Sequence, residues 1–231
     1  IYGLSYYKYR VSPYGLSRDN HYGILLLMES KTEQLGTEVI IPQETARALG
    51  KGLSQLLNEP IQAVKSYINN LKNNPQVDQD YVQRMEKAIS RILAIPDNLE
   101  HAKEAKIVPL MGGLVDFAFS EERATTGETP IQPEITIDDT TTPTLRQLTV
   151  SMQHNFNNSF NLLIGYPELI EESTDDPAVK QQAAEIASRS QSLHNYLTPI
   201  LIERRQLKIL TDATGSTTIT AIQRSVAGQK T

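Results

Sequence analysis

The side chains with the widest choice of chemistry in this sequence are its four histidines, because the 231-residue chain contains no cysteine. Without thiolates it can form neither a disulfide nor a sulfur-ligated zinc or iron–sulfur site. His21, His101 and His194 have no partner at metal-ligand spacing, and we expect them at the surface or at helix caps. His154 differs, because Asn158 follows it by one helical turn, which would place an imidazole and an amide in one patch. We predict no metal site and no cofactor.

The composition excludes several classes of protein. The 22 basic and 27 acidic residues give a formal charge of −5, which provides no long-range attraction for nucleic acid or anionic lipid. The longest apolar run, Ile24 to Met28, is far shorter than the roughly 20 residues of a transmembrane helix. No segment after Ile1 resembles a signal peptide. We therefore expect a cytoplasmic protein with no transmembrane segment and an aliphatic core.

Four segments carry apolar residues at intervals of three and four, the spacing of one helical face. They cover 43–72, 77–99, 145–170 and 177–207. Asp175 and Asp176 precede the fourth segment, and we expect them to cap its N-terminus rather than to bind a metal. The turn between the first two segments, like the turn between the last two, is rich in Asn or Asp and ends in Pro. Each pair of segments is therefore predicted to form a helical hairpin.

Short apolar or β-branched runs predict strands outside the helices. The strands at 24–28 and 39–41 are expected to form a hairpin with each other, and those at 207–210 and 217–222 to form a hairpin around Gly215. The strands are predicted at 24–28, 39–41, 114–119, 134–137, 207–210 and 217–222.

The two halves of the chain resemble each other with a period of roughly 100 residues. In each half a strand-like segment precedes two helices, and Lys-Ile-aliphatic follows them at 106–108 and 208–210. Neither hairpin can bury its apolar stripe alone. We therefore predict a mainly α fold in which two long helical hairpins form an intramolecular four-helix bundle, with short β segments at the N-terminus, connector and C-terminus. Pairing of like hairpins between two chains, in a homo-oligomer, is the alternative that the sequence leaves open.

This organisation divides the chain into five predicted segments. They are a Tyr-rich segment with short strands suited to packing or partner docking (1–42), the first helical hairpin (43–106), a Pro/Gly/Thr-rich connector (107–143), the second helical hairpin with His154 (144–208) and a C-terminal tail (209–231).

Two motifs in the second hairpin are specific. Residues 152–158 read Met-Gln-His-Asn-Phe-Asn-Asn, and residues 163–169 read Leu-Ile-Gly-Tyr-Pro-Glu-Leu. Together they resemble the phosphoacceptor helix of the dimerization and histidine-phosphotransfer (HisKA-like) domain of bacterial sensor histidine kinases. In the first hairpin Leu-Asn-Glu-Pro-Ile at 57–61 is similar to a motif of the same family, with Gln55 at the phosphoacceptor position. The resemblance covers about residues 45–105 and 144–207, as two degenerate copies in tandem.

The resemblance implies phosphorelay chemistry at one site. His154 would be a neutral imidazole nucleophile that accepts and passes on a phosphoryl group, and Asn158 would orient a hydrolytic water. The receiver domain of a response regulator would be the partner and would supply Mg²⁺ and the aspartate. On a helical wheel His154 lies opposite the apolar stripe, on a polar face with Ser151 and Asn161, so we expect it to face solvent.

The sequence departs from the family at positions that kinase activity requires. Gln55 has no imidazole, the acidic residue that follows the phosphoacceptor in the family is Asn155 here, and no ATP-binding domain is recognisable after Leu207. Autophosphorylation is therefore predicted to be lost, as in a pseudokinase. If the chain is active, it would be a histidine phosphotransferase or a response-regulator phosphatase.

Two functions of different class follow from these observations. The first is a non-kinase signalling or interaction module that docks response regulators through the outer faces of its first and third helices, as the retention of His154 and Asn158 favours. The second is a structural scaffold or assembly subunit without phosphoryl chemistry, as the changes at Gln55 and Asn155 favour. The sequence narrowly favours the first.

Overall fold

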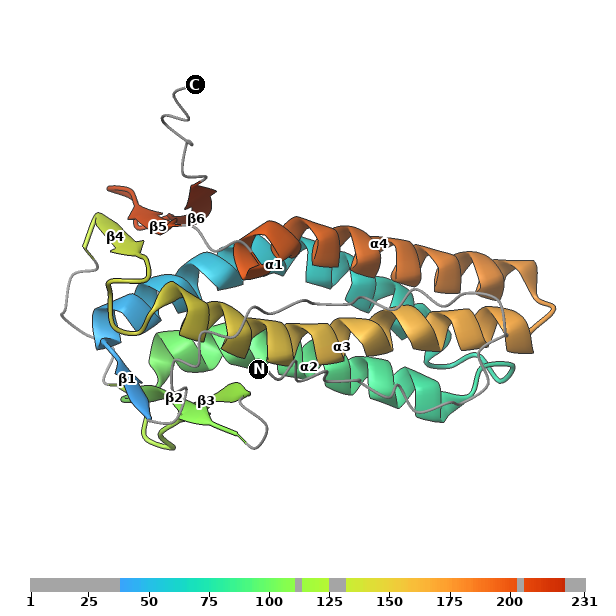
Figure 1. The fold of residues 1–231 in the computed structure, drawn as a ribbon. Helices are drawn as coiled ribbons and strands as arrows, with labels where there is room; N and C mark the ends of the chain where they lie inside the picture. Colours follow the sequence, from blue (N-terminus) through green and yellow to red (C-terminus); the bar gives the residue numbers. More distant parts are fainter. Residues whose placement is uncertain (1–37, 111–113, 125–131, 203–205, 223–231) are drawn as a thin grey trace, which may run out of the picture. The chain divides into compact units, whose positions relative to one another are not determined.

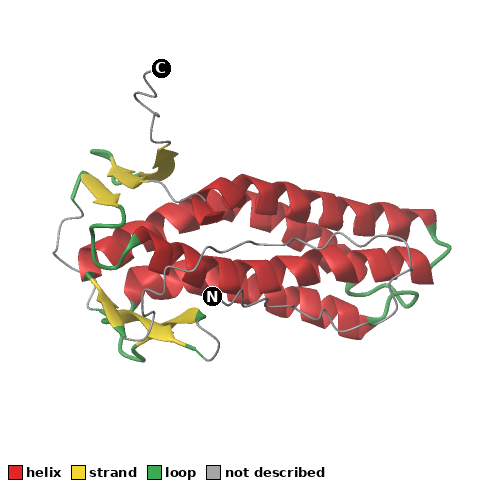
Figure 2. Cartoon of the chain, viewed as in Figure 1, coloured by secondary structure: helices red, strands yellow, loops and turns green. Residues whose placement is uncertain are grey.

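The computed structural model describes residues 38–110, 114–124, 132–202 and 206–222 (Figure 1). These residues form four long α-helices and six short β-strands, so the predicted mainly helical fold with short β segments is confirmed (Figure 2). The Tyr-rich start and the predicted strand at 24–28 lie outside the described residues. Among the helices that are described, none combines the length and the apolar character needed to cross a membrane.

The helices are α1 (Gln43–Leu71), α2 (Gln79–His101), α3 (Leu145–Ser173) and α4 (Pro177–Ile202). The sequence predicted the fourth helix to extend to about residue 207, and this was wrong at its C-terminal end. The chain instead enters a strand at Gln206, where Leu207 and Ile209 alternate with polar residues and face the core.

Side-chain caps explain where three of the helices begin. Asp78 accepts a hydrogen bond from the backbone N–H of Asp80 at the start of α2 (2.8 Å). Thr144 and Gln147 form a reciprocal capping box at the start of α3. The Asp176 carboxylate accepts from the backbone N–H of Ala178 at the start of α4 (2.8 Å), as the sequence predicted.

The strands form two antiparallel sheets. Sheet 1 has the order β1 (Val39–Ile41), β2 (Ala105–Pro109) and β3 (Val115–Phe119). Sheet 2 has the order β4 (Glu134–Ile137), β5 (Gln206–Thr211) and β6 (Thr217–Ile222). The predicted hairpin between β5 and β6 is present, and Gly215 supplies its positive φ of 79°. β1 pairs with β2, far along the chain, and the hairpin that we expected between 24–28 and 39–41 involves residues outside the described ranges.

The order β-α-α-β-β occurs twice along the described chain. Within one chain α1 contacts α2 and α4, and α3 contacts the same two helices (Figure 1). The sheets cross over between the halves: β2 and β3 pack against α3, whereas β5 and β6 pack against α1. Each half therefore depends on the other for the burial of its sheet.

The core is largely aliphatic and repeats between the halves. Fully buried residues in α1 correspond in order to fully buried residues in α3, namely Leu53, Leu57 and Ile61 to Met152, Phe156 and Phe160.

Contacts between an arginine and an aromatic ring repeat between the halves as well. The Arg189 guanidinium lies 5.3 Å from the ring centroid of Tyr67 in α1, and that of Arg84 lies 5.9 Å from the ring of Tyr166 at the same position of α3. These contacts join α4 to α1 and α2 to α3.

Candidate functional site

His154 and Asn158 lie one turn apart on α3, away from its buried stripe. The His154 side chain is half-buried and that of Asn158 is exposed. Within the described part of the chain, neither side chain has a hydrogen-bond or ion-pair partner. The imidazole and the amide are therefore both uncommitted and both reachable from solvent.

Ser151 is not on the solvent-facing surface where the helical wheel placed it. Its side chain is fully buried, and its hydroxyl has no hydrogen-bond partner. The helical wheel considered one buried face only, whereas α3 contacts β2 and β3 in addition to the other helices. Ser151 occupies the same place as Gly52 in α1, which sheet 2 covers through Ile219.

Asn155 ties α3 to sheet 1. Its amide Nδ2 donates to Asp116 Oδ1 in β3 (2.6 Å) and to the backbone carbonyl of Ser151 (2.9 Å). Thus Asn155, the residue that follows His154, is a structural donor, and its partner is a carboxylate from the other half. Sequence reasoning missed Asp116, and no local pattern around it indicates this contact.

Gln55, the counterpart of His154 in α1, is also a structural residue. Its Oε1 accepts a hydrogen bond from the backbone N–H of Thr217, the first residue of β6 (2.7 Å). The two corresponding positions have therefore diverged: Gln55 holds sheet 2, whereas His154 is free of such a contact among the residues described.

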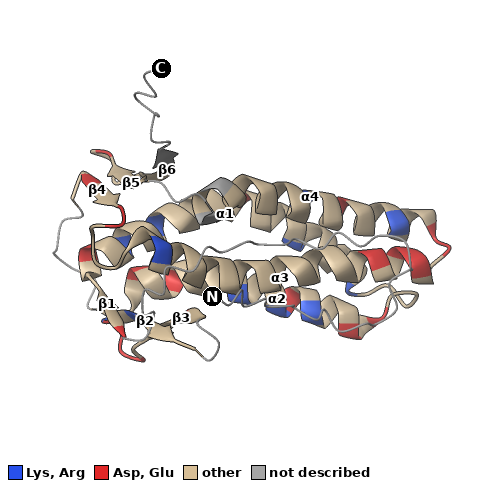
Figure 3. Ribbon diagram, viewed as in Figure 1, with Lys and Arg blue, Asp and Glu red and all other residues tan. Residues whose placement is uncertain are grey.

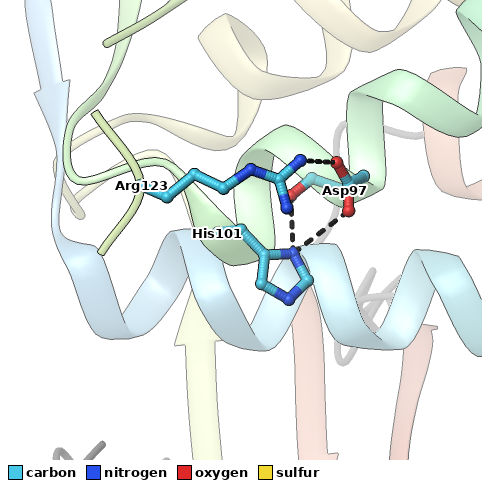
Figure 4. A network of polar contacts seen from close by, with 3 residues as sticks. All are labelled: Asp97, His101 and Arg123. Atoms are coloured by element: carbon cyan, nitrogen blue, oxygen red, sulfur yellow. Dashed lines mark hydrogen bonds and ion pairs between the residues drawn. The ribbon is translucent and has the colours of Figure 1, made fainter. Parts of the chain in front are cut away.

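The remaining histidines are engaged elsewhere. His101 Nδ1 lies 3.0 Å from the carbonyl oxygen of Asp97 and 3.2 Å from its carboxylate, and Arg123 Nη2 donates to the same carboxylate at 2.8 Å (Figure 4). This cluster joins the end of α2 to the segment after β3. His21 lies outside the described residues.

The sequence predicted His194 at the surface or at a helix cap; it lies within α4, half-buried, and packs on α3. Its Nε2 lies 2.9 Å from Asn157 Oδ1, and its ring lies 5.4 Å from that of Phe160. Burial lowers the pKa of His194 below its ordinary value of about 6.5.

The lowered pKa of His194 predicts a pH-dependent stability. The unfolded chain takes up a proton near pH 6.5, whereas the folded chain resists it, so the free energy of unfolding should fall as the pH drops below this value. Urea unfolding at several pH values between 7.5 and 5.5 measures this. His194→Gln should flatten the dependence, and His101→Gln serves as its control. An unchanged slope in His194→Gln would contradict the prediction.

Acidic side chains gather at the turn between α3 and α4 (Figure 3), at Glu171, Glu172, Asp175 and Asp176. Asp176 acts there as a helix cap. No group of three or more His, Asp or Glu side chains that could hold a metal ion occurs among the residues that the structure describes.

Comparisons of the chain with protein-family models, with curated proteins and with solved structures found no match. The assignment of a function to the His154 patch therefore rests on its geometry and on the sequence motifs.

Proposed function

We propose that this chain is a non-kinase signalling or interaction module that docks a receiver-type partner on the outer face of α3. One observation carries the proposal. His154 and Asn158 lie one turn apart, accessible and without a polar partner among the described residues, whereas the neighbouring Asn155 and the counterpart Gln55 are used in structural hydrogen bonds. A reactive imidazole beside a free amide is the arrangement that phosphoryl transfer or hydrolysis at this face requires.

The proposal includes one intramolecular four-helix bundle as the docking platform. Its support is that each helix contacts both helices of opposite direction within the same chain. The pairs Arg84–Tyr166 and Arg189–Tyr67 add contacts between the hairpins. A rigid platform of this kind would hold the side chains of α3 in place while a partner docks.

The chemistry at His154 would be transfer of a phosphoryl group. A neutral imidazole nitrogen attacks the phosphorus of a donor, a new P–N bond forms, and the bond to the donor's leaving group breaks. The phosphoryl group then passes to an aspartate of the receiver, whose Mg²⁺ offsets the charge. Alternatively, Asn158 orients a water that hydrolyses the receiver's aspartyl phosphate.

Incubation with phosphoramidate tests the first step. We expect one acid-labile, alkali-stable phosphate per chain, with ammonia as the leaving group. His154→Gln should reduce the incorporation to the background level because the nucleophile is gone, whereas the matched control His101→Gln should leave it unchanged. Intact-mass measurement and peptide mapping follow the modification.

Loss of phosphate from phosphorylated receiver domains tests the second step. Asn158→Ala should slow the loss, and Asn161→Ala, an exposed amide of the same helix, should not. If wild-type chain gains no phosphate at His154 and no receiver loses its phosphate faster in its presence, the phosphoryl chemistry is excluded.

A structural scaffold without phosphoryl chemistry is the second candidate, and a specific observation favours it. Sheets 1 and 2 pack on the first helix of the opposite half, and Asn155 and Gln55 bond to strands of these sheets. Under this function, the His154→Gln and Asn158→Ala variants would behave as wild type in both assays.

A further inference from the structure

His154 is more buried than its place on α3 accounts for. It lies roughly opposite Phe156 and Phe160 around the helix, where a side chain facing away from the core is ordinarily exposed. Asn158, one turn further on, is exposed as expected. β3 packs on α3 beside this turn, where Asn155 donates a hydrogen bond to Asp116 of the strand. In α1 the counterpart of His154, Gln55, likewise bonds to the corresponding strand β6.

The edge of β3 that lies against α3 can be identified from its backbone bonds. Leu110 N–H donates to Leu114 O, and Ser120 N–H donates to Glu104 O. Because hydrogen-bonded pairs alternate in an antiparallel ladder, Asp116 and Ala118 bond to β2, and the N–H of Phe117 points to the free edge. Asp116 Oδ1 accepts from that N–H at 2.7 Å and also from Asn155 Nδ2 at 2.6 Å.

The Asp116 carboxylate therefore joins the free edge of β3 to the residue that follows His154. A hydrogen bond to a charged acceptor is stronger than one between neutral groups. Sheet 1 is also joined to α2 through Arg123 and Asp97, beyond the far end of β3. Among the described residues, the Asp116–Asn155 bond is the polar side-chain contact between β3 and the His154 turn, and it adds to the burial of Val115 in the core.

We propose that β3 is a cover beside His154, held closed by the Asp116–Asn155 hydrogen bond, and that release of this bond increases access to the imidazole. The proposal deepens the proposed function, on which its biological meaning rests, by giving the His154 site a means of regulation. A partner that competes for Asp116 or Asn155 would open the site.

Reaction of the full chain with diethyl pyrocarbonate measures access to His154 directly. The reagent transfers an ethoxycarbonyl group to a neutral imidazole nitrogen and releases ethanol and carbon dioxide. We expect Asp116→Ala to raise the rate of modification at His154 about tenfold. Loss of a charge-assisted hydrogen bond from the closed state should raise the population of the open state by about this factor. Asp116→Asn keeps an acceptor for both donors but removes the charge, so its rate should lie between those of wild type and Asp116→Ala. Peptide mass spectrometry follows each histidine separately.

Two further variants separate this effect from general loosening. Gln55→Ala releases sheet 2 from α1 at the corresponding position and should leave the rate at His154 unchanged. Asn155→Asp places two carboxylates together and should open the cover as Asp116→Ala does, which provides a second test if Asp116→Ala does not fold. Far-UV circular dichroism and urea unfolding verify the fold of each variant.

The outcomes distinguish this inference from the proposed function. Equal rates at His154 in wild type and in the folded Asp116→Ala or Asn155→Asp variants would overturn the cover. A raised rate in these variants without phosphoramidate labelling of His154 would support the cover and refute the phosphotransfer function. If phosphoramidate labels His154 and the labelling is equally fast in wild type and all variants, the phosphotransfer function is supported and the cover is refuted.

Discussion

Replacement of Gly50 by alanine should lower the free energy of unfolding by about 3 kcal/mol. A Cβ at this position in α1 would lie 2.5 Å from the backbone nitrogen of Glu100 and 2.6 Å from the carbonyl oxygen of Pro96, both in α2. Backbone atoms cannot move aside as a flexible side chain can, so the two helices must separate. The gain in helix propensity, about 1 kcal/mol, does not offset this cost. For a chain of this size the midpoint of thermal unfolding should fall by about 6–12 °C.

Gly165→Ala is the matched control for Gly50→Ala. Gly165 also lies inside a long helix, α3, but a Cβ there would meet no atom within 4 Å. Only the higher helix propensity of alanine over glycine acts at this site, and we expect the free energy of unfolding to rise by about 1 kcal/mol. Urea unfolding at 25 °C followed by circular dichroism compares the two variants. Equal effects of both substitutions would show that α1 and α2 do not approach each other as closely as described.

Phe160→Ala should be the second strongly destabilising substitution, with a cost of about 3–5 kcal/mol. The Phe160 side chain is fully buried, and its ring lies 6.4 Å from that of Phe156 and 5.4 Å from that of His194. Its truncation removes apolar contacts and leaves a cavity that the surrounding helices can fill only in part. The same urea titration measures the loss.

Two comparisons sharpen the Phe160 prediction. Phe160→Ile introduces the residue type of its counterpart Ile61, which is equally buried, and should cost clearly less than Phe160→Ala because most of the volume is kept. Tyr196→Ala removes an aromatic ring that is 65% exposed and should change the stability by no more than about 0.5 kcal/mol. A cost below about 1 kcal/mol for Phe160→Ala would contradict its place in the core.

The Phe160 substitution also bears on the titration of His194. The ring of Phe160 is part of the surroundings that keep His194 from solvent. Truncation to alanine should let the pKa of His194 move back towards its ordinary value, so the pH dependence of stability should weaken in Phe160→Ala and weaken less in Phe160→Ile, which keeps most of the volume.

The sequence by itself determined the local elements. The spacing of apolar residues located all four helices, Asp176 was recognised as a cap, and Gly215 marked the hairpin of β5 and β6. These features depend on residues close together in the chain, where periodicity, capping and turn preferences act directly. The similarity of the two halves could be read for the same reason, because each repeats one local pattern.

Only the tertiary structure decided which elements cover α1 and α3. A helical wheel distinguishes one buried stripe from the remaining surface, so it placed Ser151 in solvent and gave no reason for Asn155 or Gln55 to be engaged. Asn155 and Gln55 bond to strands from the other half of the chain, and such contacts depend on how the two halves pack rather than on neighbouring residues. The strand β3, which we propose as the cover of His154, is likewise brought to α3 from a distant part of the sequence.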